Sequence, residues 1–436
     1  MSTFDLGSLV NTNNIGREIY HLAEKLFPIC RSITGDGVRE SLRIIADHIP
    51  IKINEIPTGT QVFDWTIPRE WNINDAYIKN GNGERIVDFN RNNLHVLNYS
   101  APIHKKINLE ELKKHIYTLP DHPDWIPYRT SYYDEKWGFC LTHNQFMDLK
   151  EDTYEVLIDS SHRDGHLTYG EYRIKGEIED EILLSAHICH PSLANDNLSG
   201  VALLTFLAKI LQASKPRYTY RFLFAPGTIG AITWLAHNEN IVNRIKHGLV
   251  IACVGDGGGP TYKKSRVGDA DIDRVTQYVL NRFSQRAVIE DFSPYGYDER
   301  QYCSPGFNLP VGLLQRSKYG RFPQYHTSAD NLTFITPENL AESLNIVSQV
   351  LYIVENNKTY INLSPKCEPQ LGKRGLYKAI GAIQREGDWQ MAMLWLLNLS
   401  DGTNSLLDVA ERSGINFQTI LAVTALLEEK QLLREI

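Results

Sequence analysis

Apolar residues recur every three or four positions near the start of the chain. Ile19, Leu22, Ala23 and Leu26 follow this spacing, and a second run with the same period ends near Ile49. Such a period places the apolar side chains on one face of a helix. The loop FPICRSITGDG lies between the two runs. The pattern therefore predicts a pair of helices between residues 15 and 49.

The pattern changes between residues 51 and 158. Short alternating stretches such as VFDWTI, DAYIK and NLHVLNY are separated there by clusters of Gly, Pro and Asn. Alternation with a period of two is typical of strands that bury one face. We therefore predict an all-β domain over residues 51–158, inserted before the main fold resumes. The aromatic cluster YRTSYYDEKWGFC within it is interpreted as part of the core and surface of this domain, with a lid of Tyr and Arg side chains over a functional site as the alternative.

Strands and helices alternate in the next part of the chain. The apolar stretches EILLSAH, YRFLFAP, GLVIACVGD and LPVGLLQR are each followed by a helical run, such as NLSGVALLTFLAKILQ. This alternation predicts an α/β fold with a mainly parallel sheet flanked by helices. Residues 1–50 and 159–362 together would form this domain. Its ligands are expected beyond the carboxyl ends of the strands.

The segment after the linker INLSPKCEPQLGKRG predicts a winged helix-turn-helix over residues 366–436, because two helices flank a Gly turn and a short strand follows. This segment holds eight Lys and Arg residues against nine Asp and Glu residues. The expected recognition helix, FQTILAVTALLEEK, has one lysine, two glutamates and mostly apolar residues, whereas helices that bind a DNA groove need several polar or basic side chains for phosphate and base contacts. We expect a module for protein contact or homo-oligomer formation.

Composition narrows the classes of partner. The 436 residues are 42% hydrophobic and 22% charged, with a formal net charge of -7. An acidic balance argues against nucleic acid or an anionic membrane as a partner. The six cysteines are scattered without a CxxC pair, and no apolar run approaches the length of a membrane span. We expect a cytoplasmic protein with reduced thiols.

Chemically active residue types concentrate in the stretch HICHPSLANDNLSG. His187 ends a buried strand, and Asp196 stands just before a helix. Asp256 follows another strand and His326 lies in a loop after a third, so all four side chains are expected at one edge of the sheet. Imidazole nitrogen and carboxylate oxygen are both ligands that suit zinc. The pattern therefore predicts a zinc site.

A second ligand set is compatible with the same stretch. The HxxH spacing of His187 and His190 also permits a site for a single metal ion, completed by His326. The number of zinc ions, one or two, stays open at this point.

Longer motifs carry a resemblance to known families. The stretches SAHICHPSLANDNLSG, VGD and YHTSADN resemble, in order and spacing, the signatures of M28-type zinc aminopeptidases. PICRSITGDGVRESL, VFDWTIPREWNI and GYDERQYCSPGFNLPVG resemble the aminopeptidase-like DUF4910/DUF2172 group, which has an inserted β domain and a C-terminal winged helix. The resemblance covers almost the whole chain.

The resemblance implies a role for each candidate residue. His187 and Asp256 would bind one zinc ion, Asp196 would bridge two, and His326 would bind the second. Asp330 would orient an imidazole. The peptide bond after Asp196 would be cis, as it is after the bridging aspartate of M28 enzymes.

One pair of positions departs from that family. M28 enzymes carry adjacent glutamates after the next strand, one as general base and one as zinc ligand, but Gly227 and Thr228 occupy these positions here. Neither side chain can act as a carboxylate. Asp298 and Glu299 are the candidates to replace the base, and we predict Glu299 as the catalytic residue.

Two functions follow from these observations. The first is a zinc-dependent, aminopeptidase-like hydrolase that cleaves an amide or peptide bond of a small peptide or an aminoacylated metabolite. The alternative is a non-catalytic zinc-binding module in a regulatory or biosynthetic assembly, because the usual glutamate pair is replaced by Gly227 and Thr228.

Overall fold

The structure, a computed structural model, describes residues 12–376 and 386–436 of the chain. These residues form two compact units that meet in sequence between Ser348 and Gln349. Within the described ranges, no helix is both long enough and apolar enough to cross a membrane.

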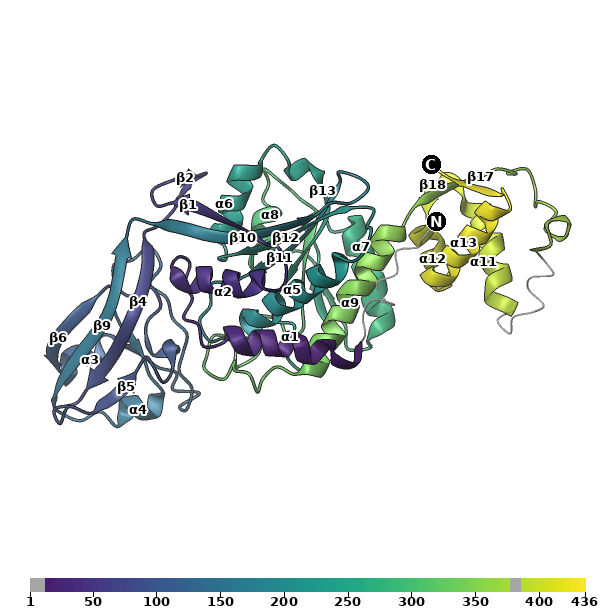
Figure 1. The fold of residues 1–436 in the computed structure, drawn as a ribbon. Helices are drawn as coiled ribbons and strands as arrows, with labels where there is room; N and C mark the ends of the chain where they lie inside the picture. Colours follow the sequence, from purple (N-terminus) through teal and green to yellow (C-terminus); the bar gives the residue numbers. More distant parts are fainter. Residues whose placement is uncertain (1–11, 377–385) are drawn as a thin grey trace. The chain divides into compact units, whose positions relative to one another are not determined.

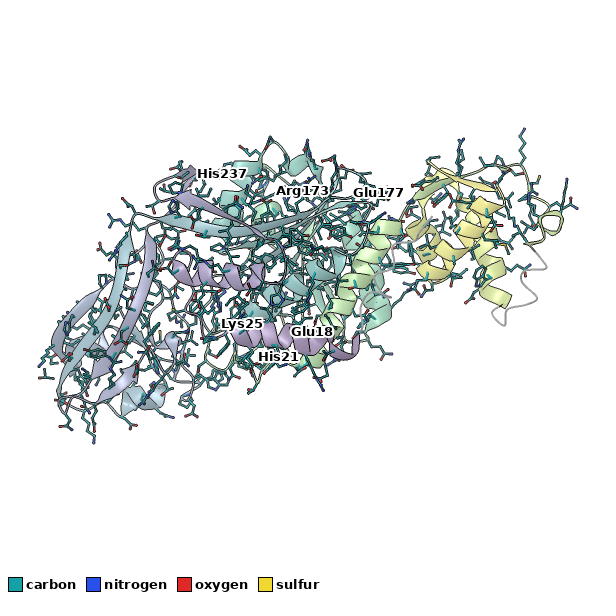
Figure 2. All side chains as sticks on the ribbon, viewed as in Figure 1. Glu18, His21, Lys25, Arg173, Glu177 and His237 are labelled. Carbon is teal, nitrogen blue, oxygen red and sulfur yellow. The ribbon has the colours of Figure 1, made fainter. Side chains whose placement is uncertain are left out.

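The first unit begins with the predicted pair of helices, α1 (Thr12–Leu26) and α2 (Asp36–Ala46). The four apolar residues that carried the periodicity are all buried in α1. Glu18, His21 and Lys25 lie on the opposite, exposed face of the same helix (Figure 2). The helical period in the sequence therefore predicted both the helix and its buried face.

An eight-stranded sheet forms the centre of this unit. Its strands run in the spatial order β1 (Lys52–Pro57), β10 (His166–Ile174), β12 (Thr219–Ala225), β11 (Glu181–His187), β13 (Ile245–Ile251), β16 (Val311–Gln315), β14 (Thr261–Lys263) and β15 (Val288–Glu290). The four central strands β12, β11, β13 and β16 are parallel, whereas β10 and β14 run antiparallel to their central neighbours. The expected α/β fold is confirmed, with antiparallel strands added toward both edges.

Helices flank this sheet. They are α5 (Gly200–Leu211), α6 (Ile229–Asn238), α7 (Asp271–Phe283) and the short α8 (Glu299–Tyr302), together with α1 and α2. In Figure 1, α1, α2 and α5 lie on one side of the sheet, and α6 and α8 lie on the other. A helical turn over Ala194–Ser199 leads directly into α5. Helix α9 (Pro337–Asn356) spans the boundary between the two units.

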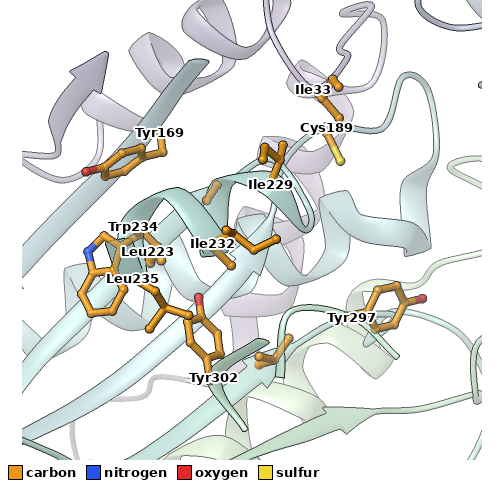
Figure 3. Close-up of a cluster of buried hydrophobic side chains, with 14 of the residues drawn as sticks. Ile33, Tyr169, Cys189, Leu223, Ile229, Ile232, Trp234, Leu235, Tyr297 and Tyr302 are labelled. Atoms are coloured by element: carbon orange, nitrogen blue, oxygen red, sulfur yellow. The ribbon is translucent and has the colours of Figure 1, made fainter. Parts of the chain in front are cut away.

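Large aromatic and aliphatic side chains pack α6 and α8 onto the sheet (Figure 3). Tyr169, Leu223, Trp234 and Tyr302 are buried in this cluster. Burial of each such side chain contributes about 1.5–3 kcal/mol relative to exposure. The packing fixes where β12 ends and α6 begins, and therefore fixes the loop between them.

A four-stranded antiparallel sheet occupies most of the predicted β insertion. Its order is β5 (Arg85–Asp88), β4 (Glu70–Lys79), β9 (Thr153–Arg163) and β6 (Ile103–Asn108). The short strand pairs β2 (Gln61–Val62) with β3 (Trp65–Thr66) and β7 (Ile116–Tyr117) with β8 (Phe139–Cys140) lie in the same segment. The segment also contains two short helices, α3 (Leu109–Lys113) and α4 (His143–Met147), so it is not entirely β.

Two expected domain limits differ from the observed sheets. Strand β1 was expected in the inserted domain, but it pairs with β10 in the eight-stranded sheet. Its alternating pattern is shared by strands of both sheets, so only the pairing partner reveals which sheet it joins. Strand β17 (Thr359–Asn362) was expected in the α/β domain, but it pairs with two strands of the C-terminal segment.

The second unit has the expected winged helix-turn-helix. Its described elements are α11 (Glu386–Leu399), β18 (Asp401–Ser405), α12 (Leu406–Ser413), α13 (Phe417–Glu429) and β19 (Leu433–Glu435), with β17 central in a three-stranded sheet. Ser405 and Asp408 form a reciprocal cap at the start of α12. Gly414 ends that helix with a φ of 71°, a conformation that glycine adopts readily.

His247 on β13 predicts a loss of stability in acid. It is buried with no hydrogen-bond partner for Nδ1 in the described residues, and burial lowers its pKa to about 4. The folded state therefore disfavours protonation, and stability that is complete above about pH 6.5 falls as the pH drops toward 4. This group contributes a loss of about 3 kcal/mol across that window.

Chemical denaturation of the wild type and the His247→Gln variant at several pH values measures this effect. We expect the difference in free energy of unfolding between the two proteins to change by about that amount between pH 7 and 4. Parallel pH profiles would show that His247 is protonated in the folded state.

Candidate functional site

The central parallel strands end at one edge of the sheet, and the site lies there. His187 is the last residue of β11, and the loop with Gly227 and Thr228 follows β12. Beyond the end of β13, Cys253 approaches the same place. The site therefore occupies the edge at which parallel sheets bind ligands.

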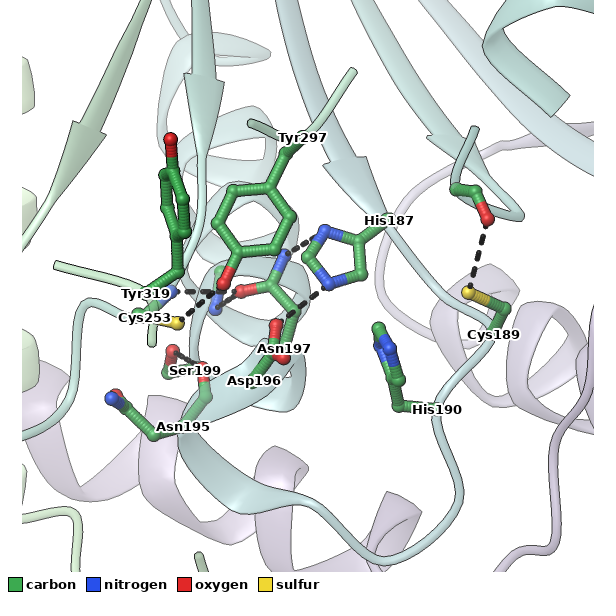
Figure 4. Close-up of polar contacts among 12 residues, drawn as sticks. His187, Cys189, His190, Asn195, Asp196, Asn197, Ser199, Cys253, Tyr297 and Tyr319 are labelled. Atoms are coloured by element: carbon green, nitrogen blue, oxygen red, sulfur yellow. Dashed lines mark hydrogen bonds and ion pairs between the residues drawn. The ribbon is translucent and has the colours of Figure 1, made fainter. Parts of the chain in front are cut away.

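Asp196 is the central side chain of the site (Figure 4). It is fully buried, its Oδ1 lies 2.8 Å from Nε2 of His187, and its Oδ2 lies 3.0 Å from Nε2 of His326. Burial alone would raise the pKa of Asp196, but the adjacent histidines outweigh burial and hold this pKa well below its usual range. One carboxylate thus lies between two imidazoles.

His190 completes the group. Its ring centroid lies 4.9 Å from that of His187 and 5.2 Å from that of His326. His187, His190 and Asp196 each offer a ligand atom, and these atoms lie within 4.8 Å of one another. The sequence offered His190 only in the alternative ligand set, and the structure brings it into the centre of the site.

Three ligand-type atoms in this group are buried and lack a full set of partners in the described part of the chain. Nδ1 of His190 has no hydrogen-bond partner, and Oδ2 of Asp196 and Nε2 of His326 have only each other, at 3.0 Å. Buried polar atoms are almost always satisfied in folded proteins, because an unpaired one costs about 1–3 kcal/mol. The nitrogen and oxygen donors suit zinc, so the residues present fit a metal ion.

The main chain of Asp196 is held by Asp330. This fully buried carboxylate accepts hydrogen bonds from the N–H groups of Asn195 at 2.6 Å and Asp196 at 3.0 Å. Burial raises the pKa of Asp330 to about 8, although these two donors act in the opposite direction. Asp330 therefore orients the backbone that carries Asp196, and the expectation that it orients an imidazole is wrong. The bond between Asp196 and Asn197 is cis, as predicted.

Asn197 holds the imidazole of His187, and the sequence analysis missed this role. Its Nδ2 lies 3.4 Å from Nδ1 of His187 and donates to the carbonyl of Ile251 at 3.0 Å. Its Oδ1 accepts from the N–H groups of Gly200 and Cys253. Tyr297 stacks on the same imidazole, with ring centroids 4.8 Å apart. The position of Asn197 directly after Asp196 was the signal available in the sequence.

Asp256 does not join the histidines, contrary to the prediction. Its Oδ1 accepts from the hydroxyl of Ser317 at 2.6 Å, and its Oδ2 accepts from the side-chain amide of Asn195 at 2.8 Å. Strand β13 ends at Ile251, so Asp256 lies several residues beyond the strand end that was expected to aim it. Asp256 therefore supports Asn195, next to the central aspartate, and is no ligand in this arrangement.

Glu299 also differs from the prediction. Its Oε1 lies 2.5 Å from Nζ of Lys263, and both side chains are completely buried. It does not line the cavity, whereas its neighbour Asp298 does. A shift of one residue at the start of α8 decides which carboxylate faces the site.

A cavity of about 270 Å³ opens over the three histidines. Its remaining wall consists of Ile33, Trp65, Tyr132, Tyr133, Gly227, Thr228, Ile229, Ile232, Gly296, Tyr297, Asp298, Arg300 and Tyr325. Tyr132 and Tyr133 come from the aromatic stretch that was interpreted as core and surface of the β domain. The cavity is therefore largely aromatic, with the imidazoles at its base.

Asp298 is the acidic residue in this wall. Both of its oxygens are buried and lack a hydrogen-bond partner among the described residues. Burial raises the pKa of Asp298 to about 6, against the opposing effect of His187. A Cβ atom added at Gly227 would lie 3.5 Å from Oδ1 of Asp298 and 3.1 Å from Cβ of His187. The carboxylate thus borders the space that a side chain at position 227 would enter.

Arg31, from the loop between α1 and α2, supports the site from behind. It is fully buried and donates from Nε to the carbonyl of His190 at 2.8 Å and from Nη1 to the carbonyl of Leu26 at 2.7 Å. Tyr128 packs edge-on against the rings of His190 and His326. These contacts hold His190 in place. The sequence alone did not define the position of this side chain.

Two family models match the chain. The model described as "Domain of unknown function (DUF4910)" matches residues 20–357, and a winged helix-turn-helix model matches residues 358–435. The second match agrees with the observed elements of the C-terminal unit.

One curated relative from Clostridium acetobutylicum is 56% identical over 424 residues, which cover 97% of this chain and 98% of the relative. Its name is "Putative polysaccharide biosynthesis protein with aminopeptidase-like domain". A crystal structure of a "putative peptidase" from the same organism has a TM-score of 0.93 and 54% sequence identity, and the alignment covers 98% of both chains.

The fold extends to more distant proteins. A zinc aminopeptidase from Bacillus subtilis has a TM-score of 0.59 at 13% identity, with 79% of this chain and 95% of that chain covered. The expected similarity to M28 zinc aminopeptidases is thereby confirmed for the fold.

The pair of Glu299 and Lys263 predicts a structural role for both residues. Glu299→Gln removes one partner of a buried ion pair, which typically lowers the free energy of unfolding by about 3–5 kcal/mol. We expect the loss near the lower end, because Lys263 keeps hydrogen bonds to the carbonyls of Ser293 and Tyr295. Denaturant unfolding measures it. A variant of wild-type stability would contradict the structural role.

Proposed function

This chain belongs to the DUF4910 family, and on that premise we propose that it is a zinc-dependent hydrolase that cleaves an amide bond of a small substrate. The observation that supports the proposal is the buried cluster of ligand atoms on His187, His190 and Asp196, which lie within 4.8 Å of one another beside a cavity and include an Nδ1 of His190 without a hydrogen-bond partner. The fold of zinc aminopeptidases agrees with it.

We assign one zinc ion to His187, His190, Asp196 and His326. A second ion would need further carboxylates, but Gly227 and Thr228 replace the usual pair, and both oxygens of Asp256 accept protein hydrogen bonds. Zinc in such a site polarises a carbonyl group and makes a bound water acidic. The donor set thus favours the single-metal alternative over a bridged pair.

Asp298 is the residue that we assign as general base and acid, in place of Glu299. Its carboxylate is buried, unpaired and part of the cavity wall. It borders Gly227, one of the positions at which M28 enzymes carry their glutamates, so the carboxylate of the residue directly before α8 compensates for the missing side chain. In this role Asp298 accepts a proton from the attacking water and donates it to the amine that leaves.

The size of the cavity limits the substrate. A volume of about 270 Å³ accommodates a group the size of one or two amino acids rather than an extended peptide. We therefore keep a small peptide or an aminoacylated metabolite as the substrate class. The name of the curated relative places that protein in polysaccharide biosynthesis, which favours a metabolite.

The C-terminal unit supplies a partner surface in this proposal. Helix α13 exposes Gln418, Ala422, Ala425 and Glu429. This face lacks the Lys and Arg side chains that contact nucleic acid backbones. We keep protein contact, including a second copy of this chain, as its role, and the cytoplasm as the location.

A non-catalytic zinc module is the second candidate. It is favoured by Gly227 and Thr228, because neither side chain can act as the general base or the metal ligand that the usual glutamate pair supplies. The two candidates share the zinc site and differ in turnover. Zinc-loaded protein that hydrolyses none of a panel of aminoacyl and N-acyl p-nitroanilides would favour the module.

The proposed zinc site predicts a loss of zinc affinity for one aspartate variant and no change for another. Asp196→Asn removes a direct ligand, so we expect zinc affinity to fall by about 100-fold or more, since even groups that only orient ligands contribute about 10- to 100-fold. Asp256→Asn is the matched control and keeps wild-type affinity. Competition with a chelator measures both, and equal losses in the two variants would contradict the ligand assignment.

Asp298 predicts a selective loss of turnover. Asp298→Asn keeps the shape of the side chain but removes its proton-accepting carboxylate, so kcat should fall about 10²- to 10⁴-fold with unchanged zinc content. Steady-state kinetics on the most active p-nitroanilide measures the effect. Glu299→Gln, assayed at a temperature where it is folded, should keep kcat within a small factor, and the reverse order would restore Glu299 as the base.

A further inference from the structure

Arg300, on α8, lines the cavity together with Asp298. Its Nε is buried without an acceptor, and Arg300 forms neither a hydrogen bond nor an ion pair with any residue in the described ranges. Other arginines of this unit have partners inside the protein: Arg39 pairs with Glu70, Arg221 with Glu181 and Arg316 with Glu342, and the fully buried Arg31 donates to main-chain carbonyls. Arg300 is therefore a cavity-lining cation without its protein anion.

The charges around the cavity leave this cation uncompensated. Apart from the three histidines, the acidic and basic residues of its wall are Asp298 and Arg300, and these two form no ion pair with each other. With the zinc ion of the proposed function in place, the two charges of the metal are balanced by Asp196 and Asp298. The guanidinium charge remains. Arg300 is partly exposed, but its Nε is shielded from solvent, and a shielded donor without an acceptor is unfavourable.

We propose that Arg300 binds an anionic group of the substrate, a carboxylate or a phosphate. A guanidinium group matches the planar oxygens of either anion through two parallel hydrogen bonds. The position of the scissile amide in this proposal rests on the proposed function, whereas the anion site itself rests on Arg300. The substrate class is thereby narrowed to small amides that carry a negative charge.

The side chains at the mouth of the cavity indicate what the uncharged part of this substrate is like. Trp65 and Tyr133 line the cavity, yet they are 44% and 50% exposed, with ring centroids 5.5 Å apart. Exposed aromatic rings at a cavity offer large contact surfaces for an apolar or ring-shaped group. An anionic amide with a ring or apolar part would therefore contact Arg300 and these two rings at once.

Binding of matched ligand pairs tests the proposal. Isothermal titration of the zinc-loaded full chain with N-acetyl amino acids and their uncharged amides compares carboxylate with neutral ligands, and methyl phosphate represents the phosphate source. We expect charged ligands to bind about tenfold or more tightly than neutral ones, as charge-assisted hydrogen bonds predict. The stronger of the two anions identifies the natural group.

Three variants distinguish anion binding by Arg300 from anion binding elsewhere on the protein. Arg300→Gln should abolish the preference without changing the affinity for neutral ligands, and Arg300→Lys should keep part of it. Arg17→Gln, on the exposed face of α1, should keep all of it. A preference that survives in Arg300→Gln overturns the proposal, and so does failure of the charged ligands to bind more tightly than the neutral ones.

The zinc-deficient Asp196→Asn variant distinguishes this proposal from the proposed function. An Arg300-dependent preference that persists there supports the anion site and excludes direct binding of the anion to zinc. If the wild type also hydrolyses no amide, the hydrolase proposal fails while the anion site stands. If the wild type hydrolyses neutral amides and Arg300→Gln changes neither this activity nor the binding of anions, the hydrolase proposal stands and the anion site fails.

Discussion

A carboxylate buried away from water is costly unless donors or cations surround it, and this constraint on Asp196 organises the site. His187 and His326 flank its two oxygens, and Asp330 holds the backbone that carries it. The end of β11 and the turn before α5 are close in sequence, but the loop after β16, which carries His326, is far from both and must meet them for these contacts to form. The sheet brings them together because its central strands are parallel.

The supporting contacts behind the histidines come from parts of the chain outside the central α/β alternation. Arg31 lies between the first two helices and holds the carbonyl of His190, and Tyr128, from the inserted segment, packs against two of the imidazoles. Trp65 and Tyr133 also come from this segment and reach the mouth of the cavity. The insertion therefore contributes to the site directly and does not merely narrow its entrance.

The site lacks the glutamate pair of M28 enzymes, but a cavity is present beside Gly227 and Thr228, which occupy these positions. Gly227 and Thr228 leave space beside His187, and the carboxylate of Asp298, directly before α8, borders that space. The same short helix adds a guanidinium group two residues later. A cavity wall with one acidic side chain, one basic side chain and imidazoles differs in charge from a site built on paired carboxylates. We therefore expect its substrate to differ from those of aminopeptidases that share the fold.

The sequence by itself determined the elements and the central residues of the site. The helical period predicted α1 and its buried face, apolar runs predicted the parallel strands, and strand ends placed His187 and His326 at one edge, because these features depend on local periodicity. Only the tertiary structure decided which of several candidate side chains, some of them neighbours in the sequence, face the site. Asp256 turned to Ser317, His190 joined the histidines, and Asp298 rather than Glu299 faced the cavity. A one-residue difference in a loop or short helix reverses the direction of a side chain, and packing against distant residues such as Lys263 fixes that direction.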